Sequence, residues 1–207
     1  MSAAAKTLTA VAVLALAGVA AFSFDAARNP GTVGMATAVA APDDGTPINA
    51  CALLSDEEVS AAVGAKVTPA ERRDDGEVGG QGKYAPAGTY SSTCFWQFHA
   101  DASGKDDPTL PMGGKRFAIL NAMVWPTKED AASFLQSFRD AFKEEIIPND
   151  PIALTGIGDE ALWWGDGTAV RKGNKSYGMS VFLQNGDKAS QRKMEEGLAR
   201  KIEGRIN

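Results

Sequence analysis

Few residues of this chain have the types and spacing that catalysis requires. His99 is the only histidine among 207 residues, so it is the only imidazole that could serve as a general base. It stands at the end of a strand-like run beside a loop, where a histidine that is hydrogen-bonded or faces solvent is the simpler interpretation. The chain has no G-x-S-x-G, H-E-x-x-H or G-x-x-x-x-G-K-[ST] pattern. Catalysis would therefore have to use His99 and scattered carboxylates, as in a hydrolase-like enzyme.

The carboxylates form no evident acid–base pair or metal site. Asp159 and Glu160 are adjacent, and adjacent side chains of a strand point to opposite faces, so they are poor partners for proton transfer. Asp101, Asp106 and Asp107 lack the spacing of an EF-hand loop. We therefore predict no catalytic residues, no metal and no cofactor.

Aromatic side chains offer a candidate binding site. Trp163 and Trp164 are adjacent in a strand-like run, so one of the two indoles should lie off the core face. That indole either packs under a helix or loop, or lines an exposed groove that binds a ligand. Tyr84 and Tyr90 flank a long polar loop and could contribute to the same groove. The candidate ligand groove is therefore formed by Tyr84, Tyr90, Trp163 and Trp164.

The two cysteines of the chain, Cys51 and Cys94, favour one structural disulfide if the protein is exported. Such a bond would close a loop of about 43 residues, which is worth about 4 kcal/mol in the chain-entropy model. A redox pair or a pair of metal ligands are the alternatives. Neither has supporting spacing, because there is no C-x-x-C motif and only one histidine.

The N-terminus predicts export. Lys6 is the only charged residue among the first 24, and the run from Leu8 to Phe22 is nearly all apolar. As a helix this run reaches about 22 Å, which is short for a bilayer core of about 30 Å and suits a secretory signal. We predict a signal peptide or signal anchor over residues 1–24, a flexible Ala/Gly/Pro-rich tether over 25–47 and one domain over 48–207.

The expected location is periplasmic or extracellular, with membrane contact only through the N-terminal segment, which is either removed or kept as a tether. The net charge of −5 repels phosphate backbones, so nucleic acid is not an expected partner. A hydrophobic content of 44% and a charged content of 23% are those of an ordinary folded domain.

The folded part of the sequence predicts an α+β domain. Caps and apolar stripes indicate helices at Asp56–Gly64, Lys128–Lys143 and Lys188–Glu203. Alternating or β-branched runs indicate strands at Ala65–Thr68, Tyr90–His99, Arg116–Trp125, Glu160–Trp164, Thr168–Lys172 and Ser176–Leu183. A loop is expected over Ala70–Gly88. The order α-βββ-α-βββ-α predicts an antiparallel sheet of about six strands with helices packed on it.

Two stretches of the chain resemble a known family. Cys51-Ala-Leu-Leu-Ser55-Asp-Glu-Glu58-Val59, with the later Thr93-Cys94-Phe95-Trp96, is similar to the opening of the uncharacterised envelope proteins grouped as DUF3558-type lipoproteins. Gly156-Ile157-Gly158-Asp159-Glu160-Ala161, followed by Val170-Arg171-Lys172-Gly173, is similar to their later strands. The resemblance covers most of residues 51–184. It implies an exported α+β domain with a disulfide between the matching cysteines, and it supplies no activity or site.

We therefore expect a non-enzymatic envelope domain that binds a protein or a small ligand. One alternative is the hydrolase-like enzyme that uses His99 and scattered carboxylates. The other is an accessory subunit of an envelope complex, which a large apolar surface patch would favour. The chain departs from the family pattern because no lipidation cysteine directly follows the apolar run.

Overall fold

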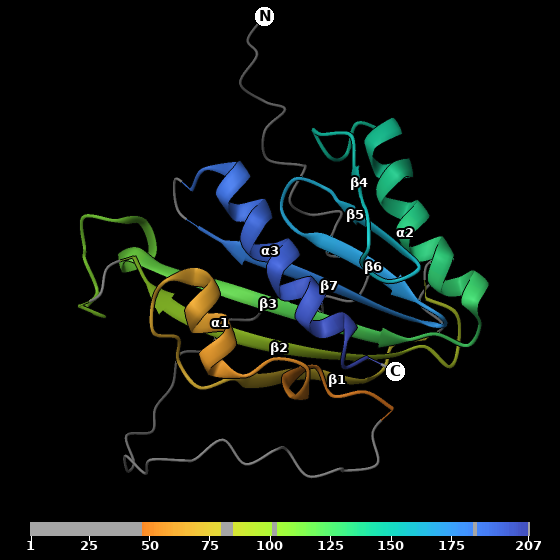
Figure 1. Cartoon of the computed structure of the whole chain (residues 1–207), viewed down its shortest axis with the longest axis horizontal. Coiled ribbons are helices and arrows are strands. Elements are labelled where there is room, and N and C mark those ends of the chain that lie inside the picture. The colour runs from red at the N-terminus through yellow and green to blue at the C-terminus, as the bar shows by residue number, and fades with distance from the viewer. Residues whose placement is uncertain (1–46, 80–84, 101–102, 184–185, 207) are drawn as a thin grey trace, which may run out of the picture.

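The computed structural model describes residues 47–79, 85–100, 103–183 and 186–206 (Figure 1). The predicted signal segment and the predicted tether up to residue 46 lie outside these ranges, as do Tyr84 and Asp101. Within them, no helix is long and apolar enough to cross a bilayer.

One antiparallel sheet carries the domain, with its strands in the order β1-β2-β3-β7-β6-β5-β4 (Figure 1). The strands are β1 (Glu71–Glu77), β2 (Tyr90–His99), β3 (Lys115–Val124), β4 (Ile152–Leu154), β5 (Glu160–Trp163), β6 (Thr168–Lys172) and β7 (Lys175–Phe182). The helices are α1 (Asp56–Val63), α2 (Lys128–Lys143) and α3 (Lys188–Glu203). The predicted α+β class and antiparallel sheet are therefore confirmed.

The helices divide between the two faces of the sheet. Successive residues of a strand point to opposite faces, so Trp163 enters the larger core with α1 and α3, while Leu162 enters a smaller core with α2. The larger core includes Val59, Trp96, Leu120, Met179, Leu198 and Ile202. The smaller core includes Met123, Trp125, Phe134, Leu135, Phe138 and Ala169. One face of the sheet thus carries two helices, and the other face carries one.

Local sequence sets the ends of the helices as predicted. Ser55 Oγ accepts from the Glu58 N–H at 3.3 Å, and the Ser55 N–H donates to the Glu58 carboxylate at 3.1 Å, which completes the capping box of α1. Gly64 ends α1 in the left-handed conformation, with φ 70°. Thr127 and Asp187 cap α2 and α3 by accepting first-turn N–H groups.

The strand predicted at Ala65–Thr68 is wrong, and the loop predicted over Ala70–Gly88 instead contains β1. β1 pairs with β2 through a register shift between Arg73 and Gly76. Its sequence, ERRDDGE, shows no apolar alternation, because it is an edge strand held by backbone hydrogen bonds rather than by a buried face. Charged side chains on an edge strand also block pairing with other chains.

The sheet has seven strands rather than the predicted six or so. Five of the predicted strands are present, and the two that were not predicted are β1 and β4. β4 pairs with β5 over three residues directly after Pro151. A run of three residues is too short to show alternation, so no periodicity in the sequence indicates it.

The predicted disulfide is confirmed between Cys51 and Cys94, whose Cα atoms are 5.0 Å apart. Cys94 is fully buried on β2, and Cys51 lies in a short 3₁₀ helix, Ala50–Ala52, just before α1. The bond spans 43 residues of sequence. It therefore ties the entry of α1 to the sheet.

Replacing both cysteines by alanine should lower the free energy of unfolding by about 3–4 kcal/mol, because the open loop gains conformational entropy in the unfolded state. Urea unfolding of the oxidised protein and of the Cys51→Ala/Cys94→Ala variant measures this difference. The reduced wild-type protein is the control and should match the double variant. A loss below about 1 kcal/mol would contradict the assignment of this stabilising role.

Candidate functional site

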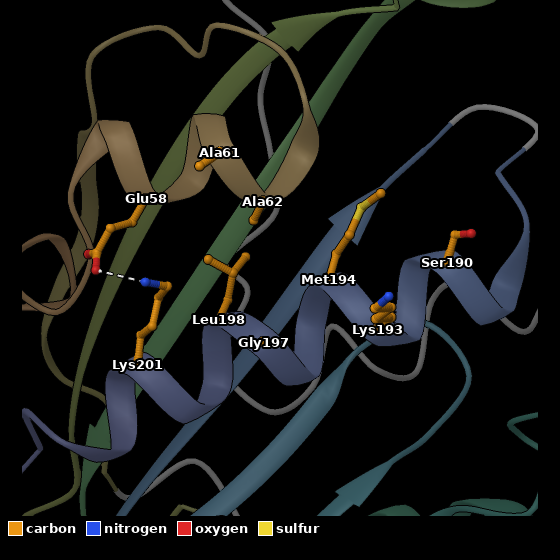
Figure 2. Close-up of a pocket in the computed structure, with 9 residues that line it drawn as sticks. All are labelled: Glu58, Ala61, Ala62, Ser190, Lys193, Met194, Gly197, Leu198 and Lys201. Atoms are coloured by element: carbon orange, nitrogen blue, oxygen red, sulfur yellow. Dashed lines mark hydrogen bonds and ion pairs between the residues drawn. The ribbon is translucent and has the colours of Figure 1, made fainter.

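A groove lies between α1 and α3 (Figure 2). Its volume is about 480 Å³, within the range of about 300–1,000 Å³ that is usual for ligand sites. Three residues from α1 and six from α3 line it. They are Glu58, Ala61, Ala62, Ser190, Lys193, Met194, Gly197, Leu198 and Lys201.

The lining residues of α3 form one stripe along that helix. They recur at spacings of three and four residues, which places them one above another on the helix surface. From Ser190 to Lys201 the stripe extends about 16 Å, at about 1.5 Å per residue. Leu198 lies where this stripe meets the buried face of α3, and it is fully buried.

The middle of the groove is apolar and is built from small residues. Ala62 points from α1 toward Leu198 of α3, and Gly197 lies between Leu198 and Met194 along the floor (Figure 2). A Cβ added at Gly197 would meet no atom within 4 Å, and the residue does not have a left-handed backbone. A glycine inside a helix costs about 1 kcal/mol relative to alanine. No contact or backbone requirement among the described residues accounts for this glycine.

An ion-pair cluster closes one end of the groove. The Glu58 carboxylate accepts hydrogen bonds from Arg205 Nη1 at 2.6 Å, from Arg205 Nη2 at 2.8 Å and from Lys201 Nζ at 3.4 Å. The Arg205 hydrogen bonds lower the pKa of Glu58 to about 2. Arg205 also donates to the Leu53 carbonyl at 2.9 Å. The cluster therefore fastens the segment after α3 to the start of α1.

The rim of the groove is cationic. Lys193 forms no ion pair with any described residue and projects from α3 beside Gly197 (Figure 2). Lys201 shares the single Glu58 carboxylate with Arg205. Among the lining residues, the two lysines outnumber the single carboxylate of Glu58, on a chain whose net charge is −5.

A buried carboxylate fixes α3 on the sheet beneath the groove. Glu195 is fully buried and accepts from the Val181 N–H at 2.8 Å, from Trp163 Nε1 at 2.8 Å and from Gln191 Nε2 at 3.0 Å. Burial raises the pKa of the Glu195 carboxyl. β6 pairs with β7 only as far as Met179, so Glu195 supplies the acceptor for the Val181 N–H beyond the end of β6. Glu195 is thus a positioning group for α3.

The structure does not bring the two predicted indoles into one groove. Trp163 is 8% exposed and donates to Glu195 in the larger core. Trp164 turns to the opposite face, where its ring stacks 5.8 Å from Phe138 of α2. The indole that lies off the larger core therefore packs under a helix, which is one of the two alternatives that the sequence left open.

Of the two predicted tyrosines, the one that the structure describes, Tyr90, joins neither indole. Tyr90 is half-buried at the start of β2 and packs against the larger core. β2 and β5 are separated by four strand spacings, which is about 19 Å across the sheet, so Tyr90 and Trp163 lie far apart. Tyr84 lies outside the described residues.

His99 lies near an acid but beyond hydrogen-bond distance. Its Nδ1 is 3.8 Å from Asp106 Oδ1, and it has no hydrogen-bond partner in the described part of the chain. Asp106 Oδ2 is 3.4 Å from Lys115 Nζ. The three residues do not line the groove. They therefore do not supply the imidazole–acid hydrogen bond in a cleft that a general base requires.

The other candidate acids have structural partners. Asp159 accepts from the Gly173 N–H at 2.8 Å and from Arg171 Nη1 at 3.0 Å, and the bond from Gly173 lowers the pKa of Asp159. Glu160 accepts from Arg139 Nη2 at 2.7 Å. Across the described ranges, no group of three or more metal-binding side chains gathers.

A second exposed apolar surface lies on the sheet face that carries α2. Phe95, Phe117 and Phe182 form a row across β2, β3 and β7, with ring centroids 5.6 Å and 4.4 Å apart. The Arg73 guanidinium lies 4.4 Å from the Phe95 ring. Phe182 is 38% exposed. We call these three phenylalanines the aromatic row.

The sequence predicted neither the groove between α1 and α3 nor the aromatic row. The groove depends on α1 and α3 lying side by side, although they are far apart in the chain. The only local signal for it is Gly197 inside an otherwise regular helical pattern. For the aromatic row, alternation marks each strand, but only the strand order brings the three rings together.

No protein-family model, curated protein or solved structure matches this chain.

Replacing Glu58 by glutamine should lower the free energy of unfolding by about 1–2 kcal/mol at pH 7. The full pKa shift of Glu58 would correspond to about 3 kcal/mol of stability. Because Arg205 is partly exposed, solvent screening reduces this free energy. The folded pKa lies below the unfolded value, so this stability is present above pH 4.5 and is lost as the pH falls toward 2.

Urea unfolding of wild type and Glu58→Gln between pH 2 and pH 7 tests this pH dependence, and the two curves should converge at the acid end. Glu144→Gln, which removes an exposed carboxylate that has no ion pair among the described residues, is the matched control. Parallel curves over the whole range would contradict a coupled Glu58–Arg205 pair.

Proposed function

We propose that this chain is an exported, non-enzymatic binding domain and that the groove between α1 and α3 is its binding site. The observation that carries the proposal is the apolar groove itself, whose floor includes a helix glycine, Gly197, that no contact or backbone requirement among the described residues explains. Ligand sites are commonly concave and mostly apolar, with a few polar groups at the rim, and the groove has this composition.

The proposal includes the expected location and family. The apolar N-terminal run and the Cys51–Cys94 bond are compatible with export to an oxidising compartment. The resemblance to DUF3558-type envelope proteins rests on the short motifs around these cysteines and stays a prediction. A binding role fits the placement of His99 and the acids, because none of the described candidates meets another in the groove.

A screen of small molecules by protein NMR should yield compounds that shift the backbone amides of Ala61, Ala62 and Gly197. Gly197→Phe should abolish these shifts, because the added ring would occupy the groove. Gly197→Ala is the matched control. Its methyl group enters open space, and we expect it to keep binding while it raises the free energy of unfolding by about 0.5–1 kcal/mol.

Compounds that bind Gly197→Phe as well as they bind the wild type would place the binding site elsewhere. So would a set of hits whose shifts all fall outside α1 and α3. Thermal unfolding of each variant establishes that a loss of binding does not come from a loss of fold.

A second candidate function is that of an accessory subunit in an envelope complex, and the aromatic row favours it. Interfaces place aromatic anchors at the centre and polar groups at the rim. The row has Gln97 and Lys115 beside Phe117, and Arg73 on Phe95. The partner would be a protein surface with an apolar centre.

A photo-crosslinking residue at Gln97, beside the aromatic row, should give one discrete protein adduct in cells. The same residue at Gln136, which is exposed on α2, is the control and should give none. Phe182→Ser should remove the Gln97 adduct, because it deletes the most exposed ring of the row. Equal adducts at the two positions, or an adduct that persists in Phe182→Ser, would exclude this role.

A further inference from the structure

We propose that the groove between α1 and α3 takes a single alkyl chain that carries an anionic head group. This inference rests on the proposed function, because it assigns a ligand class to the same site. The head would lie at Lys193, and the chain would run over Gly197 toward Leu198 and Ala61 (Figure 2).

The lining of the groove favours an alkyl chain over an extended peptide. A peptide strand would need partners for its backbone N–H and C=O groups. The floor offers side chains of Ala62, Met194 and Leu198 instead. An extended alkyl chain is narrow and has no polar groups, so it can lie against this apolar floor.

The small residues explain how such a chain could lie close to the helices. Open space lies above Gly197 at mid-groove, and the α1 wall is formed by the small side chains of Ala61 and Ala62. A methionine at the edge of the floor, Met194, is half-buried and can adapt to an irregular apolar ligand. These groups offer contact along the length of a chain and no directional hydrogen bond at its centre.

The charge at the rim selects the head group. Lys193 has no acidic partner among the described residues, and Lys201 shares Glu58 with Arg205. An anionic head therefore gains an ion pair at Lys193 without breaking an existing one. A cationic head would be repelled by Lys193, and the carboxylate of Glu58 is already engaged by Arg205. A carboxylate and a phosphate share this chemistry.

A chain-length series tests the apolar part of the proposal. Octanoate, decanoate and dodecanoate are titrated into the oxidised domain below their micelle concentrations, with amide shifts and calorimetry as readouts. The affinity should rise about two- to fourfold for each added methylene, because each is partly removed from water. The Gly197→Phe variant should bind none of the three fatty acids, and the Gly197→Ala variant should bind all three as the wild type does.

A head-group exchange tests the charge. Decyltrimethylammonium should bind the wild type at least tenfold more weakly than decanoate. Lys193→Glu should weaken the binding of decanoate by about five- to tenfold, because it converts the free cation of the rim into an anion. The variant should therefore bind decyltrimethylammonium more tightly than decanoate. Lys175→Glu, on the sheet and outside the groove, is the matched charge control and should leave both affinities unchanged. Decyl phosphate beside decanoate distinguishes a phosphate head from a carboxylate head.

The outcomes separate the ligand class from the site. If decyltrimethylammonium binds as tightly as decanoate, the anionic class is wrong while the groove stands as a binding site. If no alkyl chain binds, but the screen gives other compounds whose binding Gly197→Phe abolishes, the assigned ligand class is wrong and the proposed function stands. If decanoate binds Gly197→Phe and the wild type equally, the groove is not the site and both proposals fail.

Discussion

The anchoring of α1 is the constraint on which the groove depends. A helix of eight residues is too short to be stable alone, so contacts outside the helix must hold it. The Cys51–Cys94 bond fixes the chain just before it, and Asp56 Oδ1 accepts from Trp96 Nε1 at 2.9 Å on the same strand as Cys94. Glu58 is held from the other side by the segment after α3. One wall of the groove therefore exists only while these bonds hold.

The other wall is set by how the sheet is covered. Three helices cover the two faces of the sheet. α1 and α3 lie on the same face, and the groove runs where these two helices meet. α3 is located by Glu195, whose carboxylate takes the Val181 N–H beyond the end of β6. On the opposite face α2 covers only the region around Trp125 and Leu162, so the aromatic row stays open to solvent. The groove thus follows from the meeting of two helices on one face, and the exposure of the aromatic row follows from the single helix on the other face.

The parts of the fold that the sequence predicts are those decided by local chemistry. The capping box at Ser55, the cap at Asp187 and the alternation along β2 all use contacts within a few residues, and each is confirmed. β1 could not be predicted, because an edge strand rich in charge is specified by its partner β2 rather than by its own pattern. Glu195 was missed for a related reason. A carboxylate on a charged helix usually faces solvent, and only its spacing with Leu198 and Ile202 places it on the buried stripe.

The polar groups of the domain also bear on the kind of function it can have. A catalytic acid or base needs a lone pair or proton directed into a cleft. The carboxylates of Glu195, Asp159 and Glu58 are instead directed at donors in the fold: Glu195 at three, Asp159 at two and Glu58 at Arg205 and Lys201. The groove offers apolar surface and the ammonium group of Lys193, which forms no ion pair with any described residue. Apolar surface gains free energy when a ligand removes it from water, and a lone cation at its edge gains from an anion. Glu58, Asp159 and Glu195 therefore act in holding the domain together, and the groove leaves apolar surface and one ammonium group available to a ligand.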